Sequence, residues 1–194
     1  MTTPPGPEPE RDSWLQEAEL VDSAIYAAVA GTHTPRLDVA MRRLSTAANY
    51  SRLSIASSVL LAAFGGPRGR RAAAFGLASV AATSATANLV VKPFGRRGRP
   101  DREGQDVPVA RYVPMPDSRS FPSGHTAAAV AFASGAGYVS PLASAPLHVL
   151  AALVGYSRVH TGVHYPGDVI AGAVLGSVVA DVTVSLLEQR WPKS

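Results

Sequence analysis

The amino-acid sequence contains two long stretches without a charged side chain. No Asp, Glu, Lys or Arg occurs in residues 72–91 or in residues 120–157. An uncharged apolar run of about 20 residues is the usual mark of a membrane-spanning helix, because the bilayer core holds no water to solvate a charge. The charged residues are concentrated in the N-terminal region and in a few loops. The sequence therefore predicts an all-α fold, an integral membrane helical bundle.

Five hydrophobic segments form the core of this bundle. They are Leu53–Gly65, Ala72–Val91, Thr126–Val139, Ala145–Ser157 and Val169–Leu187. By this pattern only the second segment has the full length of a spanning helix, and the first, third and fourth need neighbouring residues to complete a crossing. Their many Ala, Gly and Ser residues favour close packing of helix backbones. A soluble bundle is the alternative, but few polar residues remain to cover a surface facing water.

Two amphipathic helices, Trp14–His33 and Pro35–Asn49, are predicted before the bundle, either in the membrane interface or as a weak crossing. The bundle therefore has about five to six hydrophobic helices, depending on whether this weak crossing is counted. The predicted organisation is a disordered polar tail, the N-terminal helices, a membrane domain and a short C-terminal tail, over residues 1–13, 14–50, 51–189 and 190–194.

The composition restricts the partners and the chemistry. A net charge of +4 indicates an anionic partner, which is nucleic acid, a lipid headgroup or a phosphorylated substrate. Nucleic acid is not favoured, because the sequence has no zinc-ligand spacing, no RNA-binding aromatic signature and no basic helix with heptads. The chain contains no cysteine, which excludes disulfides, thiolate nucleophiles and sulfur-bound metals.

Three short polar patterns lie at the ends of the hydrophobic segments. They are Lys92-x6-Arg99-Pro100, Pro122-Ser123-Gly124-His125 and Ser157-Arg158-x5-His164-x3-Asp168. If each segment crosses the membrane, residues 92–123 and residues 157–168 emerge on the same side. The sequence therefore predicts that the three patterns meet at one end of the bundle.

Several side chains in these patterns suit the binding of a phosphate group. Phosphoryl transfer needs cations around the nonbridging oxygens, and Lys92, Arg99 and Arg158 supply them. An arginine binds two phosphate oxygens with its planar guanidinium group. Ser123 and Gly124 stand where a helix is predicted to begin, where backbone N–H groups can bind an anion. These five residues are the predicted phosphate-binding set.

Two histidines and one carboxylate are the predicted catalytic groups. Asp168 follows His164 by four residues, and a carboxylate bonded to one ring nitrogen leaves the other nitrogen free and more basic. This spacing suits His164 as a nucleophile that forms a phosphohistidine. His125 then suits the general acid that protonates the leaving group. No cofactor and no metal ion is expected, because the cations neutralise charge as magnesium does elsewhere.

Each pattern alone has an ordinary explanation, such as positive residues flanking a hydrophobic helix, but their combination is not expected by chance. In these three patterns the sequence resembles the type 2 phosphatidic acid phosphatase superfamily, which includes lipid phosphate phosphatases, bacterial acid phosphatases and vanadium haloperoxidases. The resemblance covers residues 92–168. It implies the roles given above: nucleophile, acid and orienting carboxylate for His164, His125 and Asp168, and phosphate binding for Lys92, Arg99, Ser123, Gly124 and Arg158.

The resulting hypothesis is a metal-independent membrane phosphatase, acting on a lipid-linked phosphomonoester or diphosphate in a bacterial plasma membrane. A polyprenyl-linked phosphate of cell-envelope biosynthesis, including a prenyl-phosphoryl sugar phosphate, is the favoured substrate. Phosphatidic acid and phosphatidylglycerol phosphate are alternatives. Vanadate-dependent halide oxidation and non-catalytic binding of anionic lipid are competing functions. Expected partners are the lipid phosphate and membrane lipids, without nucleic acid. The membrane face of the site and the oligomeric state are left open.

Overall fold

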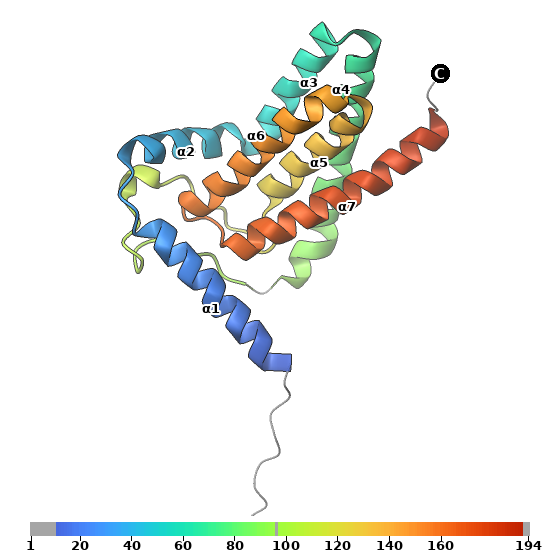
Figure 1. The fold of residues 1–194 in the computed structure, drawn as a ribbon. Coiled ribbons are helices and arrows are strands. Elements are labelled where there is room, and N and C mark those ends of the chain that lie inside the picture. Colours follow the sequence, from blue (N-terminus) through green and yellow to red (C-terminus); the bar gives the residue numbers. More distant parts are fainter. Residues whose placement is uncertain (1–10, 96, 192–194) are drawn as a thin grey trace, which may run out of the picture.

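The computed structural model of the chain describes residues 11–95 and 97–191, and these residues are helical apart from their connecting loops (Figure 1). The elements are, in chain order, α1 (Arg11–Ala30), α2 (Pro35–Ala47), η1 (Asn49–Ser51), α3 (Arg52–Phe64), α4 (Gly66–Ala85), η2 (Thr86–Val91), η3 (Lys92–Phe94), η4 (Val109–Arg111), α5 (Gly124–Val139), α6 (Pro141–His160) and α7 (Pro166–Arg190). The described residues contain no strand, so the predicted all-α class is confirmed. Of the predicted tails, residues 1–13 and 190–194, the parts 1–10 and 192–194 lie outside the described residues, whereas residues 11–13 belong to α1 and residue 190 to α7.

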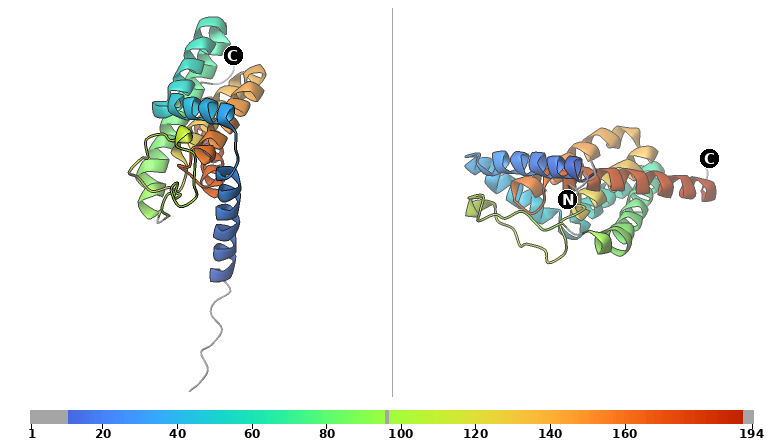
Figure 2. Two further views of the ribbon diagram at one scale, coloured as in Figure 1. Left: turned by 90° about the vertical axis from the view of Figure 1, so that its left-hand side faces the viewer. Right: turned by 90° about the horizontal axis from the view of Figure 1, so that it is seen from below.

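Helix α5 lies at the centre of the bundle and packs against α4, α6 and α7, while α3 packs mainly against α4. Helices α1 and α2 lie outside this bundle, at the end where α6 finishes and α7 begins (Figures 1 and 2). Helix α1 contacts α6 and α7, and α2 contacts α6 and η4. Helix α1 begins at Arg11, three residues before the predicted start, and the predicted division at residue 50 stays a prediction.

Small residues allow α5 and its neighbours to approach closely. A Cβ atom on Gly176 of α7 would lie 2.3 Å from the carbonyl oxygen of Ala127, and one on Gly135 of α5 would lie 2.4 Å from Oγ of Ser79. Both separations are far below van der Waals contact, so larger residues at these positions would force the helices apart. Backbone approach of this kind is typical of helices packed within a membrane.

The outer surface of the bundle is apolar. Helix α7 exposes a stripe of aliphatic side chains at every fourth position, consisting of Ile170, Val174, Val178, Val182 and Leu186. Since positions four apart lie on one face of a helix, this stripe forms a continuous apolar strip along α7. Such a surface suits lipid rather than water.

Three helical segments are long and apolar enough to cross a membrane, namely Gly66–Phe94, Pro141–His160 and Pro166–Arg190. The hydrophobic pattern had predicted only one segment of full length. The difference arises because α6 and α7 continue beyond their apolar residues. Arg158 belongs to the last turn of α6, and Asp168 to the first turn of α7. These two polar residues of the predicted site therefore lie within the end turns of the spanning helices.

A buried ion pair between Arg111 and Asp38 connects the loop before α5 to the N-terminal helices. Nε of Arg111 lies 2.8 Å from Oδ1 of Asp38 in α2, and the same oxygen lies 2.8 Å from Nε2 of His160 at the end of α6. Arg111 also donates to the carbonyl oxygen of Val29 in α1 at 2.9 Å. One carboxylate therefore joins α2, the loop and α6 at the end of the bundle that carries the three patterns.

Candidate active site

The three sequence patterns meet at one end of the bundle, as predicted. The backbone N–H of Ser123 donates to the carbonyl oxygen of Asp168 at 2.9 Å, which joins the second pattern to the third. The guanidinium of Arg99 donates to the carbonyl oxygen of Val163 at 2.7 Å, which joins the first pattern to the third. These contacts hold side chains from distant parts of the chain in one polar cluster within an apolar bundle.

His164 lies in the short loop between α6 and α7, with 3% of its surface exposed. Its Nδ1 atom is 3.5 Å from Oδ2 of Asp168, and its Nε2 atom is 3.5 Å from Nη1 of Arg99. A carboxylate beside Nδ1 favours the tautomer that carries the proton there. The lone pair then resides on Nε2, on the side where the arginine lies.

Burial lowers the pKa of His164 to about 4, and the nearby charges of Arg158 and Arg99 act in the same direction. The hydrogen bond to Asp168 opposes this shift without overcoming it. The imidazole of the free protein is therefore neutral near pH 7, because its pKa lies well below that value. A neutral imidazole with an accessible lone pair is the form that can act as a nucleophile.

Asp168 is fully buried, and its carboxylate is held by groups that were not among the predicted site residues. The hydroxyl of Ser120 donates to Oδ2, and the backbone N–H of Tyr165 donates to the same oxygen at 2.9 Å. Nη1 of Arg97 lies 3.4 Å from Oδ1. Ser120 and Arg97 are therefore additional candidates for site residues, in positions that keep the carboxylate beside His164.

His125 occupies the first turn of α5, and its Nε2 atom lies 2.9 Å from Oδ1 of Asn49 in η1. Lys92 approaches the same turn from the end of the long helix that includes α4. Its Nζ atom would lie 3.7 Å from a Cβ atom on Gly124, which is ordinary contact distance and places the ammonium group beside this residue. A π-helical segment, η2, immediately precedes Lys92, and π-helical turns are frequent at functional sites.

Arg158 is almost fully buried, and it donates to Oγ of Ser45 in α2 at 2.6 Å. Its Nε atom has no hydrogen-bond partner among the described residues. A buried donor of this kind usually requires a partner, and an anion at this position would provide one. Within the described residues, no group of three or more His, Asp or Glu side chains could hold a metal ion.

The start of α5 differs from the predicted anion site in one respect. The backbone N–H of Ser123 already donates to the backbone carbonyl oxygen of Asp168, and the hydroxyl of Ser123 lies 2.9 Å from Oγ1 of Thr126. The N–H groups available to an anion are therefore those that follow Ser123 in the first turn. Gly124 lines the pocket at this point. Its role in phosphate binding stays a prediction.

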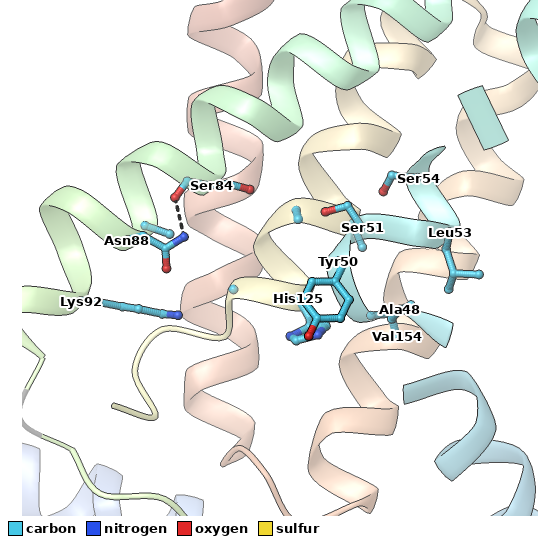
Figure 3. A pocket seen from close by; sticks show the side chains of 14 residues that line it. Ala48, Tyr50, Ser51, Leu53, Ser54, Ser84, Asn88, Lys92, His125 and Val154 are labelled. Atoms are coloured by element: carbon cyan, nitrogen blue, oxygen red, sulfur yellow. Dashed lines mark hydrogen bonds between the residues drawn. The ribbon is translucent and has the colours of Figure 1, made fainter. Parts of the chain in front are cut away.

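A cavity of about 180 Å³ opens beside Lys92, Gly124 and His125 (Figure 3). Part of its wall is polar, formed by Ser51, Ser54, Ser84 and Asn88. His164 is not among the lining residues. The cavity thus extends from the His125 side of the cluster, away from the histidine that faces Asp168.

The fold and the site define a helical membrane protein with a largely buried cluster of cations and histidines at one end of its bundle. The chain belongs to the PAP2 superfamily, whose family model matches residues 73–192. The sequence is 37% identical over 165 residues to decaprenylphosphoryl-5-phosphoribose phosphatase of Mycolicibacterium smegmatis, with 81% of each chain covered. The superfamily resemblance of the three patterns is therefore confirmed.

Other relatives agree with this assignment. The Mycobacterium tuberculosis decaprenylphosphoryl-5-phosphoribose phosphatase is 35% identical over 102 residues, which cover 50% of this chain and 52% of that protein. The match thus spans about half the length of that relative. The crystal structure of a transmembrane PAP2-type phosphatidylglycerolphosphate phosphatase from Bacillus subtilis has a TM-score of 0.69 and 26% sequence identity, covering 92% of this chain and 90% of that chain. The predicted membrane bundle is confirmed by this likeness.

Proposed function

We propose that this chain is a membrane phosphatase that removes phosphate from a lipid-linked substrate through a phosphohistidine on His164, without a metal ion. The observation that carries the proposal is the position of His164. Its Nδ1 faces Asp168, and its Nε2 faces Arg99, at 3.5 Å in each case. A nucleophilic nitrogen therefore lies where a bound phosphate group would meet a guanidinium.

In the first step, Lys92, Arg99 and Arg158 bind the nonbridging oxygens of the substrate phosphate. Nε2 of His164 attacks phosphorus, and the bond from phosphorus to the leaving oxygen breaks. The negative charge of the bound phosphate favours the protonated form of His125 in the complex. His125 donates this proton to the leaving oxygen, so the leaving group departs as a neutral alcohol. Asp168 stabilises the positive charge that develops on the imidazole of His164, as a buried carboxylate does for other catalytic histidines.

In the second step, water replaces the leaving group. His125, now neutral, accepts a proton from this water as its oxygen attacks phosphorus. The bond between phosphorus and Nε2 of His164 breaks, which releases inorganic phosphate and restores both histidines. The three cations stabilise the negative charge on the phosphoryl oxygens in both steps, so the cycle uses only water and groups that belong to the chain.

The relatives support a lipid-linked substrate. Two of them are decaprenylphosphoryl-5-phosphoribose phosphatases, and a polyprenyl-linked phosphate of cell-envelope biosynthesis is accordingly our first choice. The Bacillus subtilis neighbour is a phosphatidylglycerolphosphate phosphatase, which keeps glycerolipid phosphates as the alternative. The bacterial origin of these relatives supports a place in the plasma membrane. Non-catalytic binding of anionic lipid is the alternative from another class.

The test measures phosphate release by the detergent-purified protein in the presence of EDTA. The substrates are a prenyl monophosphate, a prenyl diphosphate, a prenyl-phosphoryl sugar phosphate and phosphatidic acid. We expect release from a prenyl substrate, loss of that release in His164→Ala, and unchanged activity in His148→Ala. His148 lies on α6 and contacts Ser134 and Ser144, outside the site. Release of phosphate from none of these lipids would refute the proposed activity.

A further inference from the structure

The pocket at His125 continues along the bundle as a groove between α3 and α6. It shares Leu53, Ser54, Ala129 and Val154 with a narrow cavity of about 20 Å³. That cavity shares Ser57 and Leu147 with a wider hollow of about 530 Å³. We call these three joined cavities the α3–α6 groove.

The packing of the helices explains why this groove exists. Helix α3 packs mainly on α4, and α6 packs on α5, whereas α3 and α6 make little contact with each other. Helix α5 therefore forms the floor, at Ala129 and Phe132. Small side chains such as Ser57 and Ala143 line the groove, so they leave the space between the two helices unfilled.

The chemistry of the groove changes along its length. At the end near His125, hydroxyl and amide side chains line the wall, as Figure 3 shows for Ser54, Ser84 and Asn88. Nδ2 of Asn88 donates to the carbonyl oxygen of Ser84 at 2.9 Å, which orients this amide at the wall of the pocket. The far end is formed by aliphatic and aromatic side chains, namely Leu60, Leu61, Phe64 and Leu147.

The groove lies on the side of the site where the leaving group must be. In an in-line displacement the leaving group departs opposite to the nucleophile. The nucleophile proposed above, His164, does not line the pocket, whereas the proposed acid, His125, does. The group whose oxygen receives the proton therefore extends from the phosphate into the groove.

We infer that the α3–α6 groove binds the leaving group of a prenyl-phosphoryl sugar phosphate, with the hydroxylated sugar in the polar pocket and the hydrocarbon chain along α3 and α6. This inference rests on the proposed function. A prenyl diphosphate fits less well, because its second phosphate adjoins the first and would lie in the pocket itself, whose only lining cation is Lys92 among the described residues. In the sugar phosphate, the sugar separates the two phosphate groups and takes this place. Hydroxyl groups, in contrast, find hydrogen-bond partners in Ser51, Ser54 and Asn88.

The first experiment blocks the far part of the groove with Ser57→Trp. The readout is the ratio of kcat/KM for a prenyl-phosphoryl sugar phosphate to kcat/KM for p-nitrophenyl phosphate, a soluble substrate without a tail. We expect this ratio to fall by about tenfold or more, because the bulky ring competes with the hydrocarbon chain for space. Val178→Trp, on the exposed face of α7, is the matched control and should keep the ratio of the unmodified protein.

The two proposals fail in different ways in this experiment. If the unmodified protein hydrolyses neither p-nitrophenyl phosphate nor any lipid of the panel above, the proposed function is wrong. If it hydrolyses both and Ser57→Trp leaves the ratio unchanged, the groove is not the binding site, although the proposed function stands. Hydrolysis of p-nitrophenyl phosphate also reports that the variant is folded.

A second experiment does not depend on how Ser57→Trp folds. A photoreactive p-benzoylphenylalanine replaces Leu147 in the inactive His164→Ala protein, and the prenyl-phosphoryl sugar phosphate is added in detergent before irradiation. Mass spectrometry should find the lipid attached at position 147 and not at a control position, 178. Equal labelling at both positions, or a crosslink to a second copy of the chain at position 147, would overturn the inference.

The polar part of the groove has its own test. Asn88→Leu removes an amide from the pocket while keeping a side chain of similar size. Loss of a hydrogen bond to a substrate hydroxyl should lower kcat/KM for the sugar phosphate by about tenfold, with a smaller change for a prenyl monophosphate. Equal losses for the two substrates would show that the pocket does not recognise the hydroxyl groups.

Discussion

The carboxylate of Asp22 on α1 accepts a hydrogen bond of 2.7 Å from the backbone N–H of Gly167, the residue before Asp168. The same carboxylate pairs with Arg97 at 2.5 Å, and the Arg97 guanidinium stacks 4.1 Å from the ring centre of Tyr165. An N-terminal helix that contributes no residue to the three patterns therefore supports the start of α7, where the candidate orienting carboxylate lies.

We expect Asp22→Ala to lower both stability and kcat. The substitution leaves the N–H of Gly167 without this acceptor and frees Arg97 to approach Asp168, which would draw the carboxylate away from His164. Loss of such a bond costs about 1–3 kcal/mol in unfolding free energy. Thermal unfolding and steady-state kinetics should show both effects, and Asp22→Asn should recover part of the loss. Glu17→Ala, at an exposed position of the same helix, is the control and should behave as the unmodified protein.

Ser120 is expected to act as a positioning residue through its hydrogen bond to Asp168. Ser120→Ala should lower kcat by about tenfold, the kinetic equivalent of one hydrogen bond to a charged group, with little change in KM. Ser120→Thr keeps the hydroxyl and should retain most of the activity. Equal activity of the Ala and Thr variants would contradict this role.

The need for the proposed acid, His125, should depend on the leaving group. Removing a general acid costs about 10²- to 10⁴-fold in rate. We expect a loss of this size for His125→Ala with a lipid phosphate, because the unprotonated leaving group is an alkoxide, which is a strong base. The loss should be much smaller with p-nitrophenyl phosphate, because nitrophenolate leaves without protonation. A rate comparison on the two substrates decides the question, and an equal loss on both would indicate a purely structural role.

The pH dependence follows from the lowered pKa of His164, which burial moves to about 4. The neutral imidazole is the reactive form, so kcat/KM should fall as the pH drops through about 4 and should show no corresponding loss near pH 6.5. The same shift affects stability. Between the unfolded value of about 6.5 and about 4, only the unfolded chain binds this proton, so the contribution of His164 to stability decreases as the pH falls through that window. An NMR titration of the His164 ring reports this group without the substrate phosphate, which itself titrates at about pH 6. A midpoint near pH 6.5 in that titration would contradict the assignment.

Gly172 couples the packing of α7 to the site. A Cβ atom there would lie 2.5 Å from the carbonyl oxygen of Ser123, so Gly172→Ala must push α7 away from the start of α5. Overpacking of this kind costs about 1–3 kcal/mol, and we expect a lower unfolding temperature together with reduced kcat. Gly31→Ala adds a Cβ at ordinary contact distance, 3.5 Å from the nearest atom, and serves as the control. Wild-type activity in Gly172→Ala would show that the site tolerates the displacement.

Much of the architecture could be predicted from the sequence because the relevant signals are local. Uncharged apolar runs mark helices wherever they occur, and each run overlaps one of α3 to α7. The alternation of these helices placed Lys92, His125 and His164 at one end of the bundle without any knowledge of side-chain contacts. The four-residue spacing of His164 and Asp168 similarly put them side by side, because α7 begins between them.

The residues that hold the site's side chains in place could not be predicted from such local signals. Asn49 lies beside His125, and Ser45 beside Arg158, only because α2 and η1 fold back across the end of the bundle. Asp22 reaches Gly167 for a similar reason. A single Asn or Ser carries no periodic signal, and its partner is far away in the chain.

The sequence by itself therefore determined the class of fold, the end of the bundle that carries the site and the chemistry of its principal side chains, because helix periodicity and short motifs are properties of neighbouring residues. Only the tertiary structure decided which groups hold Asp168 and His125 in place, and how the α3–α6 groove leads away from the pocket. Those features depend on the distances between helices, which are set by small residues packing across the bundle rather than by any local pattern.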